Sequence, residues 1–556
     1  MSEFNKIDKA IRANLEKFRK PGALTVRPGY KIKDCWVTKE PAIVVTVRKK
    51  VAKVRPEDAI PKEVGGYPTD VREATTIQKL RTVAPARYGS LAAMARPEFR
   101  QPEFSLERDA QTGELLTKPV PPATVMTFAA KQKVPYKSAK APLTPIEDIM
   151  SITCHASPDA GWIELRAFLK NIKDQLTIGM YDCTSKHILD ALLGGLKGKR
   201  KLSLVLDHPA PNPSSDQSDE QTEAALAKAL KKRQQFAWAA EANDPKVSKV
   251  IFPSAYHIKV AVKDHGSFWL SSGNWNNSNQ PDIDPFAPGA DKSHIDAIAN
   301  NSDRDWHVII EHQHLARTFE AYLLNDRVEA AKLQAKTAPA LMNAVTPLLQ
   351  ALAESPEAPI RAKRVAGRKY FEPKKISHQK IKVQPLLTPD QGPGNYVRNM
   401  LKRIRSARKT LYIQTQYMHA PKPGIDADLL TLILAVQDRI NNNVQVRIIM
   451  SEYEATGSWL ERLQEAGLDL SVVRIQTGVH NKGFIVDSNV VALGSQNWSG
   501  DGVLRNRDAT LIIWNTEAAQ YYEQIFNYDW ETFAQQTLTH EVSHPAAPSA
   551  NQATAD

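Results

Sequence analysis

The sequence predicts an α/β protein with two similar halves and a small α+β domain before them. Each half contains a strand pattern, a helical pattern and a second strand pattern in the same order. A polar motif also occurs once in each half, and every matched position is offset by 223 residues. The first observation is typical of a parallel sheet with βαβ crossovers, and the second indicates an internal repeat.

The small α+β domain is expected over residues 1–84. A charged helical pattern ends at Pro21-Gly22, and residues 42–47 form a β-branched run typical of a strand. Residues 85–145 contain nine prolines and are expected to form a linker or an extended arm. This N-terminal part either binds a partner, covers a cleft or tethers the protein, and the sequence leaves these roles open.

The first half is expected over residues 146–335 and the second over residues 386–536. Each begins with two strands that flank a helix. In chain order these elements are strand 176–181, helix 187–196, strand 202–207, strand 411–417, helix 429–440 and strand 444–450. The order of strand, helix and strand favours a parallel arrangement in both halves.

Residues 336–385 are expected to connect the halves, first as a helix and then as a basic segment. The basic part, residues 361–382, carries nine Lys or Arg residues against one acidic residue. It is either a solvated loop or a substrate contact, because Tyr370 and Phe371 suit stacking on bases or insertion at a lipid interface. Residues 537–556 are of low complexity and are expected to be a disordered tail.

Composition places the chain among globular proteins with an anionic partner. Its 556 residues carry a net charge of +12. This excess does not choose between nucleic acid and membrane lipid. No apolar run reaches the length of a membrane span, and the N-terminus has no apolar signal segment, so a cytoplasmic protein is expected. Three cysteines are too few for a disulfide framework or a zinc site.

The repeated motif joins a histidine, a lysine, an aspartate, a serine and an asparagine at fixed spacing. In the first copy these are His257, Lys259, Asp264, Ser272 and Asn274, and in the second they are His480, Lys482, Asp487, Ser495 and Asn497. The histidine and the lysine are two residues apart, so on a strand they point to the same face. A return strand then brings the serine and the asparagine close to them. Two such copies surround one cavity with imidazoles, ammoniums, hydroxyls and amides, which suits a phosphoryl group.

The motif resembles the signature HxKxxxxDxxxxxxGSxN of the phospholipase D superfamily. The second copy matches every position, and the first departs only at Ser271, where glycine is usual. Serine is small, so the site is expected to tolerate it. The resemblance covers residues 146–535 and implies two phospholipase D-like α/β domains related by pseudo-twofold symmetry, with the active site between them. Because both motifs lie in one chain, it also implies that a monomer suffices for the active site.

The resemblance further implies a mechanism. One histidine attacks phosphorus to form a phosphohistidine, while the other protonates the leaving oxygen. The nucleophile is assigned to His257 and the acid and base to His480, although at this point the two are interchangeable. Lys259, Lys482, Asn274 and Asn497 are expected to bind the phosphate, with Ser272 and Ser495 in support, and Asp264 and Asp487 are expected to tie turns near the site. No metal and no cofactor is expected.

A histidine nucleophile needs a carboxylate on its second ring nitrogen to fix the tautomer. Asp305 and Asp508 follow the two motifs, each directly before a strand pattern, and are the candidates for this role. Their offset is 203 residues, so the first half has a loop twenty residues longer, within residues 280–303. That loop is expected to border the cleft. The alternative is that both residues are ordinary turn aspartates.

Three functions fit these residues. The first is a metal-independent phosphodiester hydrolase that acts on phospholipid by hydrolysis or transphosphatidylation, with peripheral membrane contact. The second is a nuclease that cleaves DNA or RNA by the same mechanism, which the basic charge favours. The third is a non-catalytic module that binds phosphate. Two motifs in one chain are similar to phospholipases D and phospholipid synthases, which favours the first function.

Overall fold

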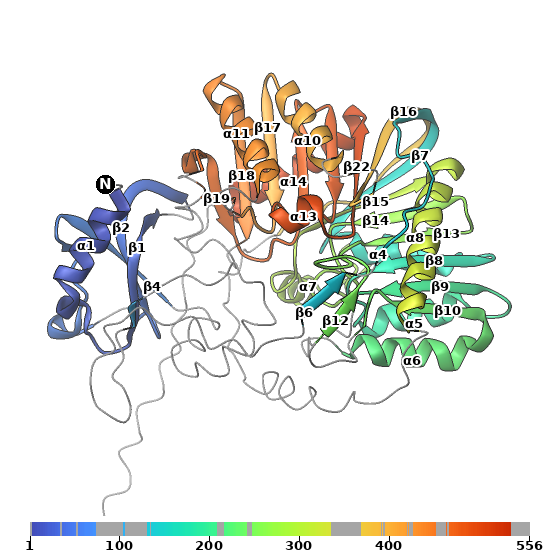
Figure 1. Ribbon diagram of the computed structural model, residues 1–556, viewed down its shortest axis with the longest axis horizontal. Helices are drawn as coiled ribbons and strands as arrows, with labels where there is room; N and C mark the ends of the chain where they lie inside the picture. The colour runs from blue at the N-terminus through green and yellow to red at the C-terminus, as the bar shows by residue number, and fades with distance from the viewer. Residues whose placement is uncertain are drawn as a thin grey trace, which may run out of the picture.

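The computed structural model has an α/β fold, in which helices lie against one long, continuous sheet (Figure 1). The structure describes residues 3–33, 36–51, 54–73, 104–105, 130–133, 135–207, 216–241, 247–334, 368–390, 392, 395–419, 421, 426–451, 463 and 466–534.

The first half runs from β7 to α8. Its main elements are β7 (Ile146–Ser157), α4 (Gly161–Lys170), β8 (Gln175–Met180), α5 (Lys186–Gly195), β9 (Lys201–Leu206), α6 (Asp219–Leu230), β10 (Gln234–Trp238), β13 (Val260–Lys263), β14 (Ser267–Ser271), α7 (Lys292–Ala299), β15 (Asp305–Glu311) and α8 (Gln313–Gln334). The pattern predicted over residues 176–207 corresponds to β8, α5 and β9. Within the longer loop of this half, the side chain of Asp291 caps α7.

The second half runs from β16 to α14. Its main elements are β16 (Lys374–Thr388), α10 (Asn395–Ser406), β17 (Thr410–Thr415), α11 (Ala427–Asn441), β18 (Gln445–Ser451), β19 (Val473–Gln476), β20 (Lys482–Val486), β21 (Val490–Gly494), α13 (Gly500–Leu504), β22 (Asp508–Trp514) and α14 (Thr516–Thr532). The boundary expected at residue 386 therefore falls inside β16. Lysines occupy exposed positions of this strand, so its sequence pattern does not show clearly that Ile376, Ile381 and Val383 are buried.

The strands of the two halves follow the same order. From the outer edge inward, the first half has β10, β9, β8, β13, β14, β15 and β7, and the second has β19, β18, β17, β20, β21, β22 and β16. Along these two orders of described strands, the outer three strands of each half run parallel, and the remaining pairings are antiparallel. The parallel arrangement expected for the strand–helix–strand segments is confirmed at β8–β9 and β17–β18, and the return strand expected after each motif histidine forms the antiparallel hairpins β13–β14 and β20–β21.

The halves are joined by antiparallel pairing of β7 with β16. They also share one hydrophobic core, which contains Trp306 of the first half and Ile485 and Tyr522 of the second. The ring centroids of Trp306 and Tyr522 lie 4.9 Å apart. This shared core fixes the motif strands of one half against those of the other.

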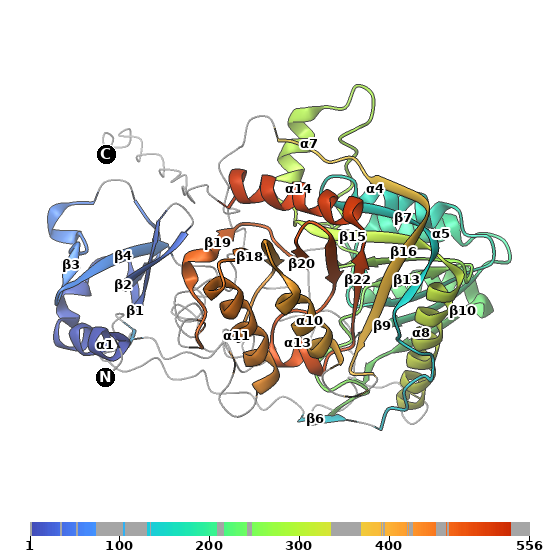
Figure 2. The same ribbon diagram turned by 90° about the horizontal axis from the view of Figure 1, so that it is seen from above.

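The N-terminal domain is a small α+β unit at one end of the molecule in both ribbon views (Figures 1 and 2). It contains α1 (Glu3–Ala13), β1 (Ala23–Lys33), β2 (Trp36–Val47), β3 (Glu63–Val64) and β4 (Tyr67–Glu73). Strand β2 pairs with β1, with β4 and, at Trp36, with Arg474 of β19. The domain is thus attached to the outer edge of the second half.

The proline-rich segment contributes two short strands. Strand β5 (Phe104–Ser105) pairs with β1, and β6 (Ala130–Lys133) pairs with β12 (Val247–Val250). The rest of this segment up to residue 129, the expected helix at 338–357 and the tail at 537–556 lie outside the described residues.

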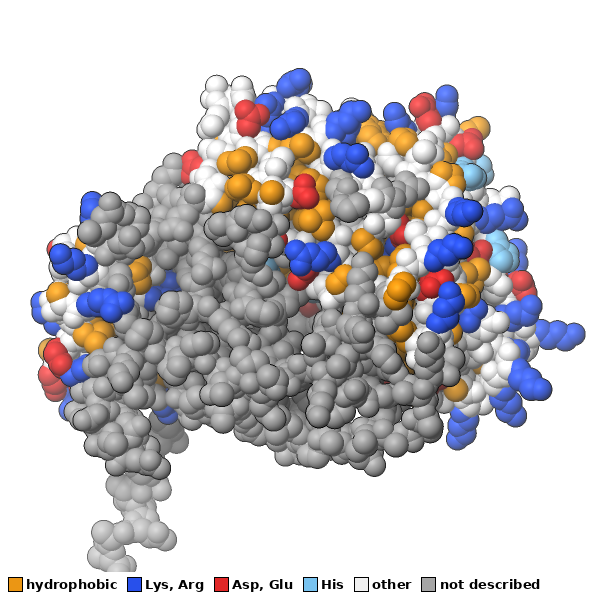
Figure 3. Space-filling model, viewed as in Figure 1, with side chains coloured by type: hydrophobic (Ala, Val, Ile, Leu, Met, Phe, Trp, Pro, Cys, Tyr) orange, Lys and Arg blue, Asp and Glu red, His pale blue; other side chains and the backbone are white. Residues whose placement is uncertain are grey.

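The described part of the basic connector packs on the body of the protein. The Tyr370 hydroxyl donates to Asp296 of α7 at 2.6 Å, and Phe371 is buried with its ring 5.6 Å from that of Tyr528. These aromatic side chains are thus held in packing contacts. On the face seen in Figure 3, Lys and Arg side chains are spread over both halves. Among the described helices, none combines the length and the apolar character that a membrane crossing requires.

Candidate active site

The two histidine–lysine pairs lie where the halves meet. His257 and Lys259 directly precede β13, while His480 precedes β20 and Lys482 begins it. His257 is 7% exposed, Lys259 is fully buried and Lys482 is 6% exposed. Burial on this scale makes each charge strongly sensitive to its neighbours.

Each histidine is paired with a carboxylate of the opposite half. Nδ1 of His257 lies 2.8 Å from Oδ1 of Asp508, and Nδ1 of His480 lies 3.1 Å from Oδ1 of Asp305. The structure therefore brings both aspartates to the imidazoles, and it crosses the pairs between the halves. A proton on Nδ1 donates to the carboxylate and leaves Nε2 as the ring nitrogen that does not bind it.

The two motif serines contact these aspartates. Ser272 Oγ donates to Asp305 Oδ1 at 2.6 Å, and Ser495 Oγ donates to Asp508 Oδ1 at 2.6 Å. Each hydroxyl also accepts the backbone N–H of the residue after its aspartate. Since the one hydroxyl proton is directed to the carboxylate, the serines orient the aspartates in this structure. Direct support of a phosphate by these serines stays a prediction.

The lysine ammoniums are held close to the histidines. Lys259 Nζ donates to the carbonyl of His257 at 2.6 Å and lies 5.1 Å from the ring centroid of Tyr181. Lys482 Nζ lies 3.0 Å from both ring nitrogens of His480 and donates to its carbonyl oxygen. It also lies 3.5 Å from the carbonyl of Ser272, so it too reaches across to the other half.

The motif asparagines have unused hydrogen-bonding capacity. Asn274 and Asn497 are 6% and 3% exposed, and the Oδ1 atom of each accepts no hydrogen bond from the described residues. The backbone N–H of Asn274 donates to Asn279, which fixes the turn after β14. An amide oxygen accepts hydrogen bonds, so this atom suits a donor, whereas a phosphate oxygen would have to be bound by the Nδ2 group of each amide.

The motif aspartates lie in turns away from the imidazoles. Asp264 accepts the backbone N–H groups of Lys173, Asp174 and Gln175 at 2.8–3.0 Å. Asp487 accepts those of residues 408–410 at 2.7–2.9 Å. Each aspartate therefore ties the hairpin of its motif to the start of the neighbouring strand, which is β8 in the first half and β17 in the second.

The two histidine–aspartate pairs differ in their affinity for protons. Burial, together with the Lys259 ammonium, lowers the pKa of His257 to about 3. Burial raises the pKa of a carboxyl, but His257 and Lys259 hold that of Asp508 below its usual value. In the other pair, burial raises the pKa of Asp305 to about 7, and burial with Lys482 lowers that of His480. Below pH about 7 the His480–Asp305 pair thus holds one proton more than the His257–Asp508 pair.

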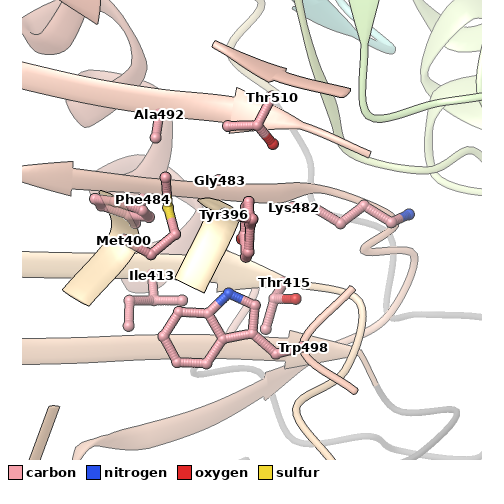
Figure 4. Close-up of a pocket in the computed structure, with 10 residues that line it drawn as sticks. All are labelled: Tyr396, Met400, Ile413, Thr415, Lys482, Gly483, Phe484, Ala492, Trp498 and Thr510. Carbon is pink, nitrogen blue, oxygen red and sulfur yellow. The ribbon is translucent and has the colours of Figure 1, made fainter. Parts of the chain in front are cut away.

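A small cavity lies behind Lys482 (Figure 4). It is lined largely by apolar side chains, among them Met400, Phe484 and Trp498, and its volume is about 10 Å³. This space is sufficient for about one water molecule. It is too small for a substrate and is best described as incomplete packing of the second half.

Sequence reasoning missed the arginines that precede the two aspartates. Arg304 and Arg507 are fully buried, and each makes ion pairs with carboxylates of both halves. A signal for them was present in the sequence, because the offset of 203 residues that relates Asp305 to Asp508 also relates these arginines. Such a signal is weak on its own, because arginines are most often surface residues.

Comparison with known proteins identifies the family. The model of the cardiolipin synthase PLD-like domain matches residues 400–530. A phospholipase D of Rickettsia felis is 30% identical over 158 residues, which are 27% of this chain and 73% of that protein. The chain belongs to the phospholipase D superfamily.

Other superfamily members are similar over part of the chain. A mitochondrial cardiolipin hydrolase of Mus musculus is 29% identical over 136 residues, 24% of this chain and 58% of that protein. The solved phosphatidylserine synthase of Haemophilus influenzae is 15% identical with a TM-score of 0.42, and the match covers 67% of this chain and 85% of that one. As a phospholipase D superfamily member, the chain is a phosphodiesterase-type enzyme.

Proposed function

We propose that the protein is a phosphodiester hydrolase that acts on phospholipid through a covalent phosphohistidine. The observation that carries this proposal is the crossed pairing of His257 with Asp508 and of His480 with Asp305. It places two oriented imidazoles and two ammoniums at one junction. A buried group of this kind stabilises the charge that develops on a phosphoryl group in the transition state.

The difference in proton affinity supports the assignment of roles. His257 is neutral, and its paired Asp508 is ionised, so Nε2 of His257 has the lone pair that a nucleophile needs. Below pH about 7 the His480–Asp305 pair holds one proton more than the His257–Asp508 pair, which suits the general acid. We therefore assign the nucleophile to His257 and the acid and base to His480.

The reaction then proceeds in two displacements. Nε2 of His257 attacks phosphorus, the bond from phosphorus to the leaving oxygen breaks, and His480 donates its proton to that oxygen. Water next attacks phosphorus and gives a proton to His480, the bond from phosphorus to Nε2 of His257 breaks, and a phosphomonoester is released. Throughout, Lys259, Lys482, Asn274 and Asn497 bind the non-bridging oxygens, while Ser272 and Ser495 hold the aspartates.

A phospholipid substrate is supported by the relatives. The names of the family model and of the similar proteins refer to cardiolipin and phospholipid chemistry. Such a substrate requires peripheral contact with a membrane, and one chain contains both motifs, so a monomer suffices. The second candidate is a nuclease, which the net charge of +12 favours.

One comparison separates these candidates. Wild type and His257→Ala are incubated with labelled phosphatidylglycerol vesicles and with single- and double-stranded DNA, in the presence of EDTA. Turnover of lipid alone, lost in the variant, is the expected result. Cleavage of DNA alone would replace the lipid assignment by the nuclease. Absence of turnover of lipid, of DNA and of bis-p-nitrophenyl phosphate would leave the third candidate, a module that binds phosphate.

A further inference from the structure

Two buried arginines stand directly before the aspartates that face the histidines. The Arg304 side chain is 2% exposed and that of Arg507 is fully buried. Arginine is rarely buried in this way unless its guanidinium is fully paired, so the contacts of these two side chains define their role.

Arg304 connects three parts of the molecule. Its Nη1 donates to the carbonyl of Ser157, which ends β7, at 2.8 Å and to Asp159, just after β7, at 2.9 Å. Its Nε and Nη2 donate to the two oxygens of Asp529 on α14 at 2.9 and 3.0 Å. The guanidinium thus holds a carboxylate of its own half and forms a bidentate pair with one of the other half.

Arg507 makes the corresponding contacts in the opposite direction. Its Nε and Nη2 donate to the two oxygens of Asp326 on α8 at 2.7 and 2.8 Å, and its Nη1 donates to Asp390 just after β16. Asp326 and Asp529 differ by the same 203 residues as the two arginines. The same cross-link is therefore built twice, once from each half.

The backbone of each arginine holds the loop before the opposite histidine. The N–H of Arg304 donates to the carbonyl of Gly478 at 2.7 Å, and its carbonyl accepts the N–H of His480 at 3.1 Å. The N–H of Arg507 donates to the carbonyl of Ala255 at 2.9 Å. Arg304 thus precedes Asp305 and is hydrogen-bonded to the segment that contains His480. Arg507 precedes Asp508 and is hydrogen-bonded to the segment just before His257.

The side-chain networks lead to the same two segments. Asp529 accepts Nε2 of Gln414 at 2.8 Å, and Oε1 of Gln414 accepts Nδ2 of Asn481 at 3.2 Å. Asn481 lies between His480 and Lys482. On the other side, Asp326 accepts the hydroxyl of Tyr256, which directly precedes His257, at 3.2 Å.

We propose that Arg304 and Arg507 are positioning residues that set the two imidazole–carboxylate pairs across the junction of the halves. The effects of this role on reaction rates rest on the proposed function. Arg304 supports the His480–Asp305 pair, so its replacement impairs protonation of the leaving oxygen. Arg507 supports the His257–Asp508 pair, so its replacement impairs the attack on phosphorus.

The test uses Arg304→Lys and Arg507→Lys, which keep the charge but lose the planar fork that holds a carboxylate through two nitrogens. The control is Arg505→Lys, because Arg505 is 45% exposed and pairs only locally with Asp501 in the described structure. Rates are measured with aryl methyl phosphates whose leaving groups range from p-nitrophenol to phenol. The ratio of rates between two leaving groups does not depend on how much enzyme is folded.

Arg304→Lys is expected to lose less than about tenfold with p-nitrophenol and about 100-fold with phenol, because only the poorer leaving group requires the acid. Arg507→Lys is expected to lose the same factor with every leaving group, and Arg505→Lys is expected to match wild type. If both buried variants show the same dependence on the leaving group, or if neither differs from the control, the positioning role is wrong.

A second measurement is independent of turnover. The Nδ1 proton that bridges each imidazole and its aspartate gives a downfield NMR signal, assigned by the loss of one signal in Asp305→Asn and of the other in Asp508→Asn. Each arginine variant is expected to broaden or shift the signal of its own pair, with the other signal unchanged. Absence of phosphodiester turnover in wild type would reject the proposed function alone. In that case the positioning role would be rejected only if both arginine variants left the NMR signals unaltered.

Discussion

The two halves of the molecule repeat the polar site but not the packing behind it. Gly494 ends β21 beside Thr510, whereas the corresponding residues of the first half are Ser271 and His307, joined by a hydrogen bond of 2.6 Å. A Cβ atom at Gly494 would lie 2.2 Å from the Ala509 carbonyl oxygen. The first half therefore has room for a side chain at this position, whereas the second half has none. The residues that surround the position consequently differ between the halves.

The contacts between the halves also combine a small residue on one side with a large residue on the other. A Cβ atom at Gly483 would lie 2.5 Å from the ring of Trp306, which is fully buried. By the same offsets, the equivalent residues are Val260 and Ala509, so a larger residue stands in place of the glycine and a smaller one in place of the tryptophan. Close packing conserves the summed volume of a contact rather than the identity of either residue. Chemistry is less tolerant, because a phosphoryl group requires the same polar atoms from both sides.

The largest expected difference between the halves is kinetic. With an aryl diester of p-nitrophenol, His257→Ala is expected to lose all covalent catalysis, whereas His480→Ala loses only about 10²-fold because this leaving group needs little acid. Initial rates of the two variants, measured beside wild type, give the comparison. Equal losses in both variants would contradict the assignment of His257 as nucleophile.

The next effect concerns packing at the motif glycine. Gly494→Ser is expected to lower the free energy of unfolding by about 3 kcal/mol, because the new side chain meets backbone on a closed strand. Ser271→Gly is its matched variant and is expected to cost about 1–2 kcal/mol for the lost hydrogen bond. Denaturant titration of both variants measures the difference. A smaller loss in Gly494→Ser than in Ser271→Gly would show that the second half relaxes around the added atoms.

A third effect is the pH dependence of the first chemical step. The pKa of Asp305 is raised to about 7, so the His480–Asp305 pair holds its proton below that pH and loses it above. Because the acid must be protonated, kcat/KM for a poor leaving group is expected to be constant from pH 5 to near 7 and to fall at higher pH. His257, with a pKa of about 3, stays neutral throughout this range.

The variant Asp305→Asn tests the origin of that pH profile. It removes the titrating carboxyl, so the alkaline limb near pH 7 is expected to disappear or move, with a rate lower by about 10–100-fold. Asp508→Asn is the matched variant and is expected to lower the rate while the limb stays in place. Profiles of kcat/KM from pH 5 to 9 separate these outcomes, and an unchanged limb in Asp305→Asn would assign the titration to another group.

Much of this site could be predicted from sequence, and what could not has a physical reason. The spacing of His257 and Lys259 and its repetition predicted the paired motifs, because strand geometry is local. The crossing of Asp305 to His480 was not predictable, since an offset shows which residues are equivalent but not which residues meet. Equally, the lysines of β16 resembled a solvated segment, because its pairing with β7 is a long-range contact that the sequence pattern does not contain.

The smallest effect is expected where the halves are truly equivalent. Asp264 and Asp487 have positive φ angles of 51° and 50°, and each holds the backbone of a neighbouring turn. Asparagine tolerates this conformation, so Asp264→Asn and Asp487→Asn lose only the charge and one acceptor, at about 1 kcal/mol each. Because neither aspartate contacts an imidazole in the described structure, kcat is expected to be unchanged in both. Unequal losses of stability, or a fall in kcat in one variant alone, would show that the halves differ in their turns as well as in their packing.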